Sequence, residues 1–548
     1  MTMRERDLSK MPADTEAVGH ALLPESHPLR VIGEHLADIV ADQAFADLYE
    51  DRGRGAIPPS ILALVTILQF LEKVPDRQAA EMVVFRLDWK FALRLPLDYA
   101  GFNYTDLHYF RQRIVDHEQE ELVFNTILAK VKALGFIKKR GKQRTDSLAI
   151  VGAVQRLSVY ELVNETLRVV IHALEKADPG WVSRVLPEAL REYYARMKPE
   201  YKLTDQERQE ALLKAGKDGF WLLVQIDQSG SKTVKELPEV ETIRRVWDQR
   251  FKRVAGSEGP SVVYEESADS KELIVSPHDP GVRAGQKRGE QWHGDKAHVT
   301  ETCDEGQPRF ITDVTTSNAT SGDGEALPGI REHLADREVS PGRHYTDAGY
   351  VSGTQMAKSE GEGIILMGPP LEDTSPNKFK IDDFSIDREA RQATCPEGKT
   401  SVKWTNRTER DGSVGVNIYF AVEDCQACRY WGECATGSKS GRSLHIGEHH
   451  ERLMARRAEA KTEAFKAEMK VRAGIEATLS ELVRGHGFRR HRYRGDQKRH
   501  FENLLKAAAC NLKRLVRALL ARWEGARQQA AKAVAGLGEG KLVAMASG

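Results

Sequence analysis

Asp146, Asp347 and Glu476 are acidic residues in three well-separated segments, RTDS, HYTDAGY and RAGIE. Carboxylates brought within about 4 Å repel by roughly 4 kcal/mol per pair at an effective dielectric near 20, a cost that a cation readily offsets. Hard magnesium or manganese ions prefer such oxygen ligands. Two of these ions about 3.5–4 Å apart supply what phosphodiester cleavage and strand transfer need: a nucleophilic oxygen, a stabilised leaving oxygen and charge neutralisation at the phosphate. The three acids are therefore candidates for a two-metal site. For each acid the alternative is a capping or solvent-exposed residue.

Four of the six cysteines form a second candidate metal site. Cys425 and Cys428 are separated by two residues, and Cys395 and Cys434 lie in the same stretch. Four thiolates suit tetrahedral zinc, and such a site would be structural because it leaves no open position for a substrate. The alternative is four reduced cysteines without a metal.

A basic strip between Arg484 and His500 contains a single acid, Asp496. Basic side chains in such a strip would neutralise several phosphates and make DNA binding depend steeply on salt. Phe488 and Tyr493 could stack on an unpaired base at a cleaved end. The alternative is an ordinary solvated face. The residues of this strip that we predict to bind DNA are Arg489, Arg490, Arg492, Arg494 and Lys498.

Lys296 and His298 lie in the segment RGEQWHGDKAHVTE, on a predicted strand. Alternate strand residues share a face, so the two side chains could face a DNA phosphate near the acids. The alternative is a solvent-facing strand edge.

Composition favours a soluble globular protein with several structural units. Hydrophobic residues make up 40% and charged residues 30% of the 548 residues, and basic and acidic residues number 81 each. The net charge therefore gives no information about nucleic-acid binding. Only the uneven distribution of the charged residues along the chain bears on it. The longest apolar stretch, 57–71, is interrupted by polar residues and prolines and is shorter than a membrane span, and the first residues contain no secretory signal. We expect a cytoplasmic, nucleoid-associated protein that makes no contact with a membrane.

The elements that must position these residues follow from the hydrophobic periodicity. A helical pattern covers 29–137, a strand with Asp146 near its start covers 143–154, and helices return from 157 to about 256. KAHVTET and RFITDVTT read as a hairpin, followed by a helix at 325–337, the short strand HYTDAGY, a small helix and the strand IILMG. This order of strands and helices matches a ribonuclease H-like α/β fold with a mixed sheet and helices on both faces.

The predicted domain organisation follows from these elements. It comprises a disordered arm (1–28), a helical N-terminal domain that could bind DNA ends (29–138), a first part of the catalytic domain (139–156), a helical insertion (157–265), a second part of the catalytic domain (266–383), a four-cysteine insert (384–447), a helical end with Glu476 and the basic strip (448–536), and a tail (537–548).

The three acidic motifs, in this order and on these elements, resemble those of the DDE transposases of bacterial insertion sequences. The resemblance covers roughly residues 140–520 and includes RGHGFRRHRYRG and AAACNLKRL, with a weaker likeness in the N-terminal region. It implies DNA contacts by Arg472, Lys296 and His298, and an insert of the four-cysteine kind. Family members often carry a tyrosine before the arginine and a lysine after the glutamate. Met469 and Val483 stand at those places here, so any DNA contacts by that pair are not implied.

The resemblance and the residues together predict a magnesium- or manganese-dependent transposase. We expect it to bind double-stranded DNA at terminal inverted repeats, cleave at the element ends and join a 3′ hydroxyl to target DNA, as a homodimer in the synaptic complex and with structural zinc. Two alternatives stay open: a zinc-containing DNA-binding protein, derived from a transposase, that has lost catalysis, and a ribonuclease H-like nuclease without strand transfer.

Overall fold

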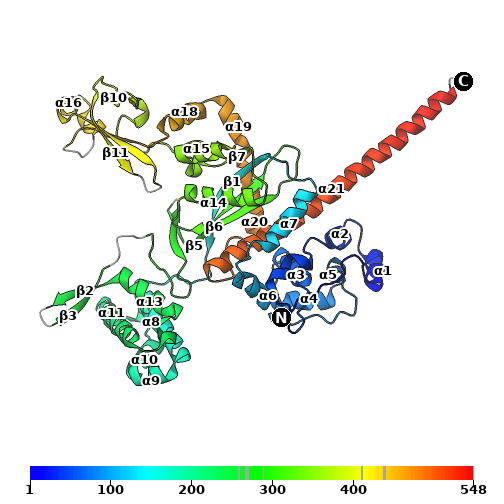
Figure 1. The fold of residues 1–548 in the computed structure, drawn as a ribbon, viewed down its shortest axis with the longest axis horizontal. Helices are drawn as coiled ribbons and strands as arrows, with labels where there is room; N and C mark the ends of the chain where they lie inside the picture. Colours follow the sequence, from blue (N-terminus) through cyan, green and yellow to red (C-terminus); the bar gives the residue numbers. More distant parts are fainter. Residues whose placement is uncertain (257–258, 266–270, 288, 409–411, 436–439, 547–548) are drawn as a thin grey trace.

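A six-stranded mixed sheet lies in the middle of the molecule (Figure 1). The computed structural model describes residues 1–548 except 257–258, 266–270, 288, 409–411, 436–439 and 547–548. The strand order is β4-β5-β1-β7-β8, and β6 also pairs with β5. β1 is parallel to β7 and antiparallel to β5, while β7 and β8 are parallel. The strands are β1 (Lys142–Val151), β4 (Arg283–Lys287), β5 (Glu290–Thr302), β6 (Ile311–Asn318), β7 (Arg343–Tyr345) and β8 (Ile365–Met367).

These strands agree with the sequence prediction except in three respects. The segment HYTDAGY, predicted as a strand, forms β7 only as far as Tyr345 and then a short helix at Ala348–Tyr350. Sequence periodicity did not predict β4, and it placed the start of β5 at Lys296, whereas the strand begins at Glu290. The first half of β5 is polar and pairs with the equally polar β4, so neither segment shows an alternation of apolar residues. The mixed sheet confirms the α/β class.

Helices cover both faces of the sheet. α14 (Asp323–Asp336), which packs on β5 and β6, shares one apolar cluster with α15 (Gly353–Gly361), which packs on β8. A larger core joins strand residues such as Ile150 and Val299 to α20 (Ile475–His486), α21 (Asp496–Ala546) and the N-terminal helices. The N-terminal helices therefore do not form a separate globule but share the core of the sheet.

The N-terminal region is helical, as predicted, but it begins earlier. Residues 13–22, predicted to belong to a disordered arm, form α1, with Thr15 buried and donating a hydrogen bond to the Leu95 carbonyl (2.6 Å). Gly19 packs against the Phe91 ring so closely that a side chain would not fit. Small residues make this contact, so the sequence lacks an apolar period there. The helices are α1 (Ala13–Leu22), α2 (Pro28–His35), η1 (Asp42–Leu48), α3 (Pro59–Glu72), α4 (Asp76–Phe85), α5 (Leu87–Leu93), α6 (Thr105–Asp116) and α7 (Leu122–Ala133).

The segment between β1 and β4 forms a helical unit with its own core. Capping boxes begin its two longest helices, at Ser158 with Glu161 and at Thr204 with Glu207. The unit ends in the hairpin β2 (Phe251–Gly256) and β3 (Gly259–Tyr264), and for β2 the sequence predicted continued helix. The alternation of apolar and polar residues that is typical of a strand covers too few residues in this segment to outweigh the preceding helical pattern. The helices are α8 (Val159–Ala177), α9 (Pro179–Val185), α10 (Glu188–Ala195), η2 (Glu200–Lys202), α11 (Asp205–Gln228), α12 (Lys232–Lys235) and α13 (Pro238–Arg250).

The cysteine-bearing segment and the C-terminal helices complete the chain. The first packs around its own apolar cluster and contains η4 (Ile381–Asp383), β9 (Ser385–Asp387), β10 (Gln392–Thr394), β11 (Ser401–Thr408), β12 (Val414–Phe420), α16 (Val422–Gln426), α17 (Trp431–Cys434) and β13 (Ser443–Ile446). After it come α18 (His450–Ala460), α19 (Glu463–Ala473), α20 and α21. α21 continues to Ala546, although the sequence predicted a tail from residue 537, and Figure 1 shows it projecting from the body.

Among the described residues, every helix is too short or too polar to cross a membrane.

The insertion offers a direct test of its packing. A Cβ at Gly219 on α11 would lie 2.1 Å from Cε2 of the buried Trp247 ring. We expect Gly219→Ala to destabilise the insertion by about 1–3 kcal/mol, because overpacking outweighs the gain in helix propensity. Differential scanning calorimetry should show a lower melting temperature. Gly230→Ala is the matched control, since no atom lies within 4 Å of its Cβ position, and equal effects of the two changes would contradict the packing.

Candidate active site

The register of two parallel strands sets Asp146 and Asp347 at the same level of the sheet. Arg144 on β1 is paired with Tyr345 on β7, and each aspartate follows two residues later. β7 ends at Tyr345. The backbone N–H of Thr346 still donates a hydrogen bond to the Met367 carbonyl of β8, and Asp347 is the N-cap of the short helix η3 (Ala348–Tyr350). The two predicted aspartates therefore come from neighbouring strands, one within a strand and the other just beyond the end of its neighbour.

Asp146 is buried and its carboxylate has two partners. Its Oδ1 accepts a hydrogen bond from the Ser147 backbone N–H (2.8 Å), and its Oδ2 accepts one from Arg472 Nη1 on α19 (2.9 Å). The guanidinium of Arg472 is about one quarter exposed. The acid thus already has one cationic neighbour, contributed by a helix more than 300 residues away in sequence.

Asp347 lies beside a further acid, Asp323, at the start of α14. The position that a Cβ on Gly349 would take is 3.1 Å from Asp347 Oδ1 and 3.3 Å from Asp323 Oδ2. Asp347 Oδ1 also accepts a hydrogen bond from the Gly349 N–H (2.9 Å). Burial, together with the negative charges of Asp146 and Asp323, raises the pKa of Asp347 above its usual value. Three aspartates, two of them predicted, therefore share one negatively charged site.

Lys296 contacts this acidic site through Asp323. Its Nζ donates to Asp323 Oδ1 (3.2 Å) and to the Ser321 carbonyl (2.7 Å), and the Ser147 hydroxyl donates to Asp323 Oδ2 (3.3 Å). The lysine therefore offsets one charge of the acidic group, and its side chain is one fifth exposed.

His298 shares a strand face with Lys296, as predicted, but it is fully buried and does not face solvent. Its Nδ1 bonds to the Tyr350 hydroxyl (2.6 Å) and its Nε2 to the Ser317 hydroxyl (2.8 Å). Burial lowers its pKa to about 4, so the imidazole is neutral near pH 7. In this geometry His298 holds Tyr350, which also bonds to Ser147, and it presents no nitrogen to a phosphate.

Glu476 is exposed in the first turn of α20, a helix that packs against β1. The three predicted acids are not among the described residues whose metal-type ligand atoms all gather within 4.8 Å of one another. The structure thus joins Asp146 and Asp347 and leaves Glu476 on the adjoining helix.

The helices that carry Arg472 and Glu476 are fixed by a buried ion pair. Arg144 Nη2 lies 2.5 Å from Glu301 Oε1 on β5, and Arg144 Nη1 donates to the Val471 carbonyl at the end of α19 (2.5 Å). The other oxygen of Glu301 accepts from Thr478 on α20 (2.5 Å) and from Arg514 on α21 (3.1 Å). Both Arg144 and Glu301 are inaccessible to solvent.

The predicted basic strip divides into exposed and buried parts. Arg489, Arg490, Arg492 and Arg494 are exposed and Lys498 is half-buried. Phe488, which the sequence offered as a stacking residue, is buried in the main core, and Tyr493 is largely buried against Arg111. The arginines remain accessible, whereas the aromatic rings serve packing.

Sequence reasoning missed Asp323, Tyr350 and the Arg144–Glu301 pair. The sequence does contain a signal for Arg144, because this residue stands two positions before Asp146 and therefore lies on the same face of the strand. Asp323 has none, since an acid at a helix start normally reads as a capping or dipole-compensating residue.

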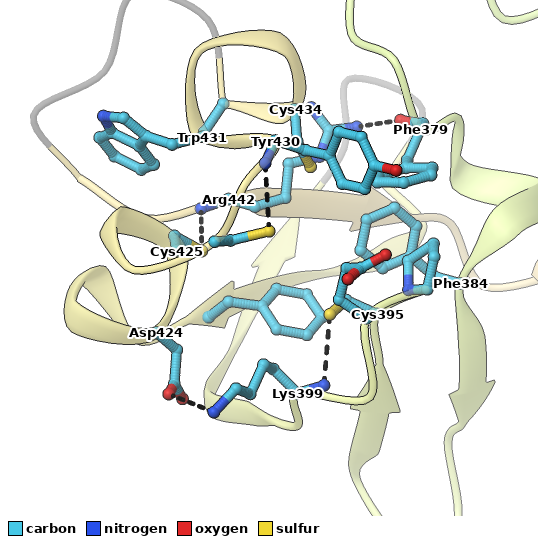
Figure 2. A pocket seen from close by; sticks show the side chains of 15 residues that line it. Phe379, Phe384, Cys395, Lys399, Asp424, Cys425, Tyr430, Trp431, Cys434 and Arg442 are labelled. Atoms are coloured by element: carbon cyan, nitrogen blue, oxygen red, sulfur yellow. Dashed lines mark hydrogen bonds and ion pairs between the residues drawn. The ribbon is translucent and has the colours of Figure 1, made fainter.

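The four predicted cysteines line one cavity of about 40 Å³ between β10, α16 and α17 (Figure 2). Backbone N–H groups of Lys399, Tyr430 and Arg442 donate to Cys395, Cys428 and Cys425 at 3.3–3.5 Å. All four thiols are half-buried and none forms a disulfide. Burial raises the pKa of Cys434, and the other three cysteines add to this. Among the described residues, no three of these sulfurs all lie within 4.8 Å of one another.

Comparison with known families gives two matches, both to transposases. Residues 394–516 match a family described as a transposase DDE domain, and residues 18–113 match one described as a transposase domain (DUF772). No curated protein matches the chain. The first match contains Arg472, Glu476 and the basic strip, and the second covers the N-terminal helices. The two matches support a DDE transposase of insertion-sequence type.

Proposed function

We propose that the chain binds the terminal inverted repeats of a mobile element, cleaves DNA at their ends and transfers the 3′ end to target DNA. Asp146, Asp347 and Glu476 are the metal-binding acids of this proposal. The observation that carries it is the register of β1 and β7, which brings Asp146 and Asp347 together from segments about 200 residues apart. The strand order, with β1 between antiparallel β5 and parallel β7, supports a ribonuclease H-like catalytic domain.

The donors at this site fit magnesium or manganese. All are carboxylate oxygens, and the like charges that raise the pKa of Asp347 are the repulsion that a divalent cation removes. When bound, two such ions supply the activated nucleophile and stabilise the leaving oxygen. Asp146 and Asp347 would hold them from the sheet, and Glu476 from α20.

The basic residues around the acids bind and orient DNA in this proposal. Arg472 has five N–H donors, of which one binds Asp146, and its partly exposed guanidinium suits a phosphate next to the acids. Lys296 is one fifth exposed and neutralises Asp323. The exposed arginines at 489, 490, 492 and 494 extend this positive surface beyond α20.

Two copies of the chain, one on each element end, would form the synaptic complex.

The two alternative functions differ from this proposal in measurable activity. A catalytically inactive DNA-binding protein would bind ends without cutting them, and a nuclease would cut without joining.

Cleavage of DNA that carries the element ends tests the assignment. We expect the native chain to cut and join these ends in magnesium or manganese. Asp146→Asn, Asp347→Asn and Glu476→Gln should reduce cutting to background while binding persists, because each change keeps the shape but removes a charged metal ligand. Denaturing gels report cutting, and gel shifts report binding.

Glu463→Gln is the control for Glu476, since Glu463 is an exposed acid near the start of the preceding helix, α19. It should cut as the native chain does. A triad variant that still cuts was wrongly assigned, and a native chain that binds without cutting favours the inactive alternative.

Asp347 also makes stability depend on pH and metal. Its pKa is raised in the fold, so the folded state binds this proton more tightly than the unfolded chain, and stability is lost as the pH rises through the folded pKa. In chelator at neutral pH, Asp347→Asn should therefore melt at a higher temperature than the native chain. The difference should shrink as the pH falls towards that pKa.

Magnesium should raise the melting temperature of the native chain more than that of Asp347→Asn, because the ion binds the folded state. Calorimetry at several pH values, with magnesium or with chelator, measures both effects. A lower melting temperature for Asp347→Asn in chelator would refute the crowding of charges at this site.

Structural zinc is proposed for Cys395, Cys425, Cys428 and Cys434. Four thiols that face one cavity, three of them already accepting backbone N–H bonds, have the donor chemistry of a structural site. Zinc requires the sulfurs to lie closer together than in this structure, so binding would tighten the segment around its apolar cluster.

Zinc removal provides the test. Cys425→Ser combined with Cys428→Ser should abolish one zinc equivalent and make residues 384–447 sensitive to protease, because binding energy at such sites is folding energy. Metal analysis and limited proteolysis report the two effects. Cys303→Ser, which changes a thiol outside the cavity, should do neither, and unchanged zinc in the double variant would reject the site.

A further inference from the structure

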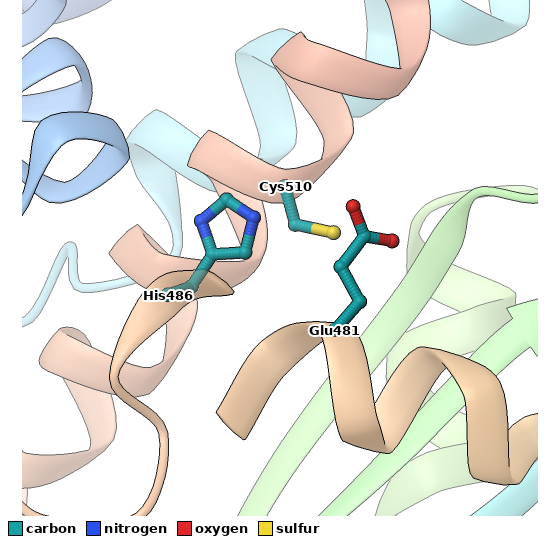
Figure 3. Close-up of side chains that lie close together, drawn as sticks. All are labelled: Glu481, His486 and Cys510. Carbon is teal, nitrogen blue, oxygen red and sulfur yellow. The ribbon is translucent and has the colours of Figure 1, made fainter. Parts of the chain in front are cut away.

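Three different metal-type ligands, Glu481, His486 and Cys510, come together between α20 and α21 (Figure 3). Glu481 and His486 lie on α20 and Cys510 on α21, and their ligand atoms all lie within 4.8 Å of one another. This group is separate from both the proposed acids and the four-cysteine cavity.

His486 carries the second, independent observation. Its side chain is 2% exposed, and within the described part of the chain neither ring nitrogen has a hydrogen-bond partner. A buried polar atom left without a partner is destabilising, so such a group calls for a ligand. Burial, and next the charge of Lys513, lower the pKa of His486 to about 4, so the ring is neutral and keeps a lone pair for a metal near pH 7.

We infer that Glu481, His486 and Cys510 form a zinc site that fastens α20 to α21. One imidazole nitrogen, one thiolate and one carboxylate oxygen form a mixed donor set of the kind zinc accepts, whereas magnesium would reject the sulfur and the nitrogen. Water completes the four ligands from the side of Glu481, which is about one quarter exposed. Binding replaces the Cys510 S–H proton, which leaves to solvent, by a zinc–sulfur bond.

The cations around Glu481 are compatible with this role. Lys513 donates to Oε1 (3.0 Å) and Arg514 to Oε2 (2.9 Å), and these contacts outweigh burial and lower the pKa of Glu481 to about 2. Arg514 donates to Oε2 through Nε as well (3.1 Å), so Glu481 accepts three hydrogen bonds in all. A carboxylate offers about four lone-pair sites, so these bonds leave one on Oε1 for a metal, and outer hydrogen bonds of this kind hold ligating carboxylates in place. Arg514 also favours ionisation of the Cys510 thiol, whose pKa burial raises to about 12.

The site would act on the geometry of α20 rather than on chemistry. Glu476 stands at the start of this helix and His486 at its end. Zinc at the end of α20 therefore fixes the direction of the helix that carries the third proposed acid.

Metal counting on the full-length chain tests the inference. In a Cys425→Ser, Cys428→Ser background, which removes the other proposed zinc, native mass spectrometry should find about one zinc equivalent. Adding His486→Gln or Cys510→Ala should remove it. Adding His172→Gln or Cys303→Ser should not, because His172 is an exposed histidine on α8 and Cys303 lies outside the group.

Cobalt gives an independent readout. In the same background Co²⁺ should show a thiolate charge-transfer band that Cys510→Ala abolishes while circular dichroism stays unchanged. A background chain that binds neither zinc nor cobalt would overturn the inference, as would one whose metal survives both His486→Gln and Cys510→Ala. DNA cleavage is not measured here, so failure of this site and failure of the proposed function are separable.

Discussion

The buried pair of Arg144 and Glu301 is the interaction on which the rest of the site depends. It joins β1 to β5, and through the remaining donors and acceptors of the two side chains it reaches α19, α20 and α21. Losing one partner of a buried ion pair typically costs about 3–5 kcal/mol, because the other charge stays buried and uncompensated. Two of the proposed acids, Asp146 on β1 and Glu476 on α20, stand on elements that this pair connects, so electrostatics inside the protein helps to set their relative positions.

Much of this architecture could be predicted from the sequence, because β1, the hairpin of β5 and β6, and the helices around them have clear periods. RTDS and HYTDAGY could be placed on strands for the same reason, whereas the pairing of those strands as neighbours comes from the structure. The sequence could not predict that His298 points inwards. A strand pattern says which residues share a face, but burial depends on α14 and η3 covering that face.

Other features could not be predicted because they leave only a weak signal in the amino-acid sequence. Asp323 is an ordinary acid at a helix start until the chain folds and brings it beside Gly349. α1 packs through Thr15 and Gly19, small residues that give no hydrophobic period, and β4 is polar because it pairs only with the polar end of β5. In each case tertiary contact, rather than local pattern, decides the outcome.

The shared core of the N-terminal helices and the sheet has a mechanical consequence. α3 and α7 pack directly on α21, and residues such as Phe124 and Ile127 belong to the same apolar cluster as Ile150. A force or rotation applied to the N-terminal helices is therefore transmitted through this shared packing to the strand that carries Asp146. If those helices bind a DNA end, the packing they share with the sheet sets the path of that DNA relative to Asp146 within a single chain.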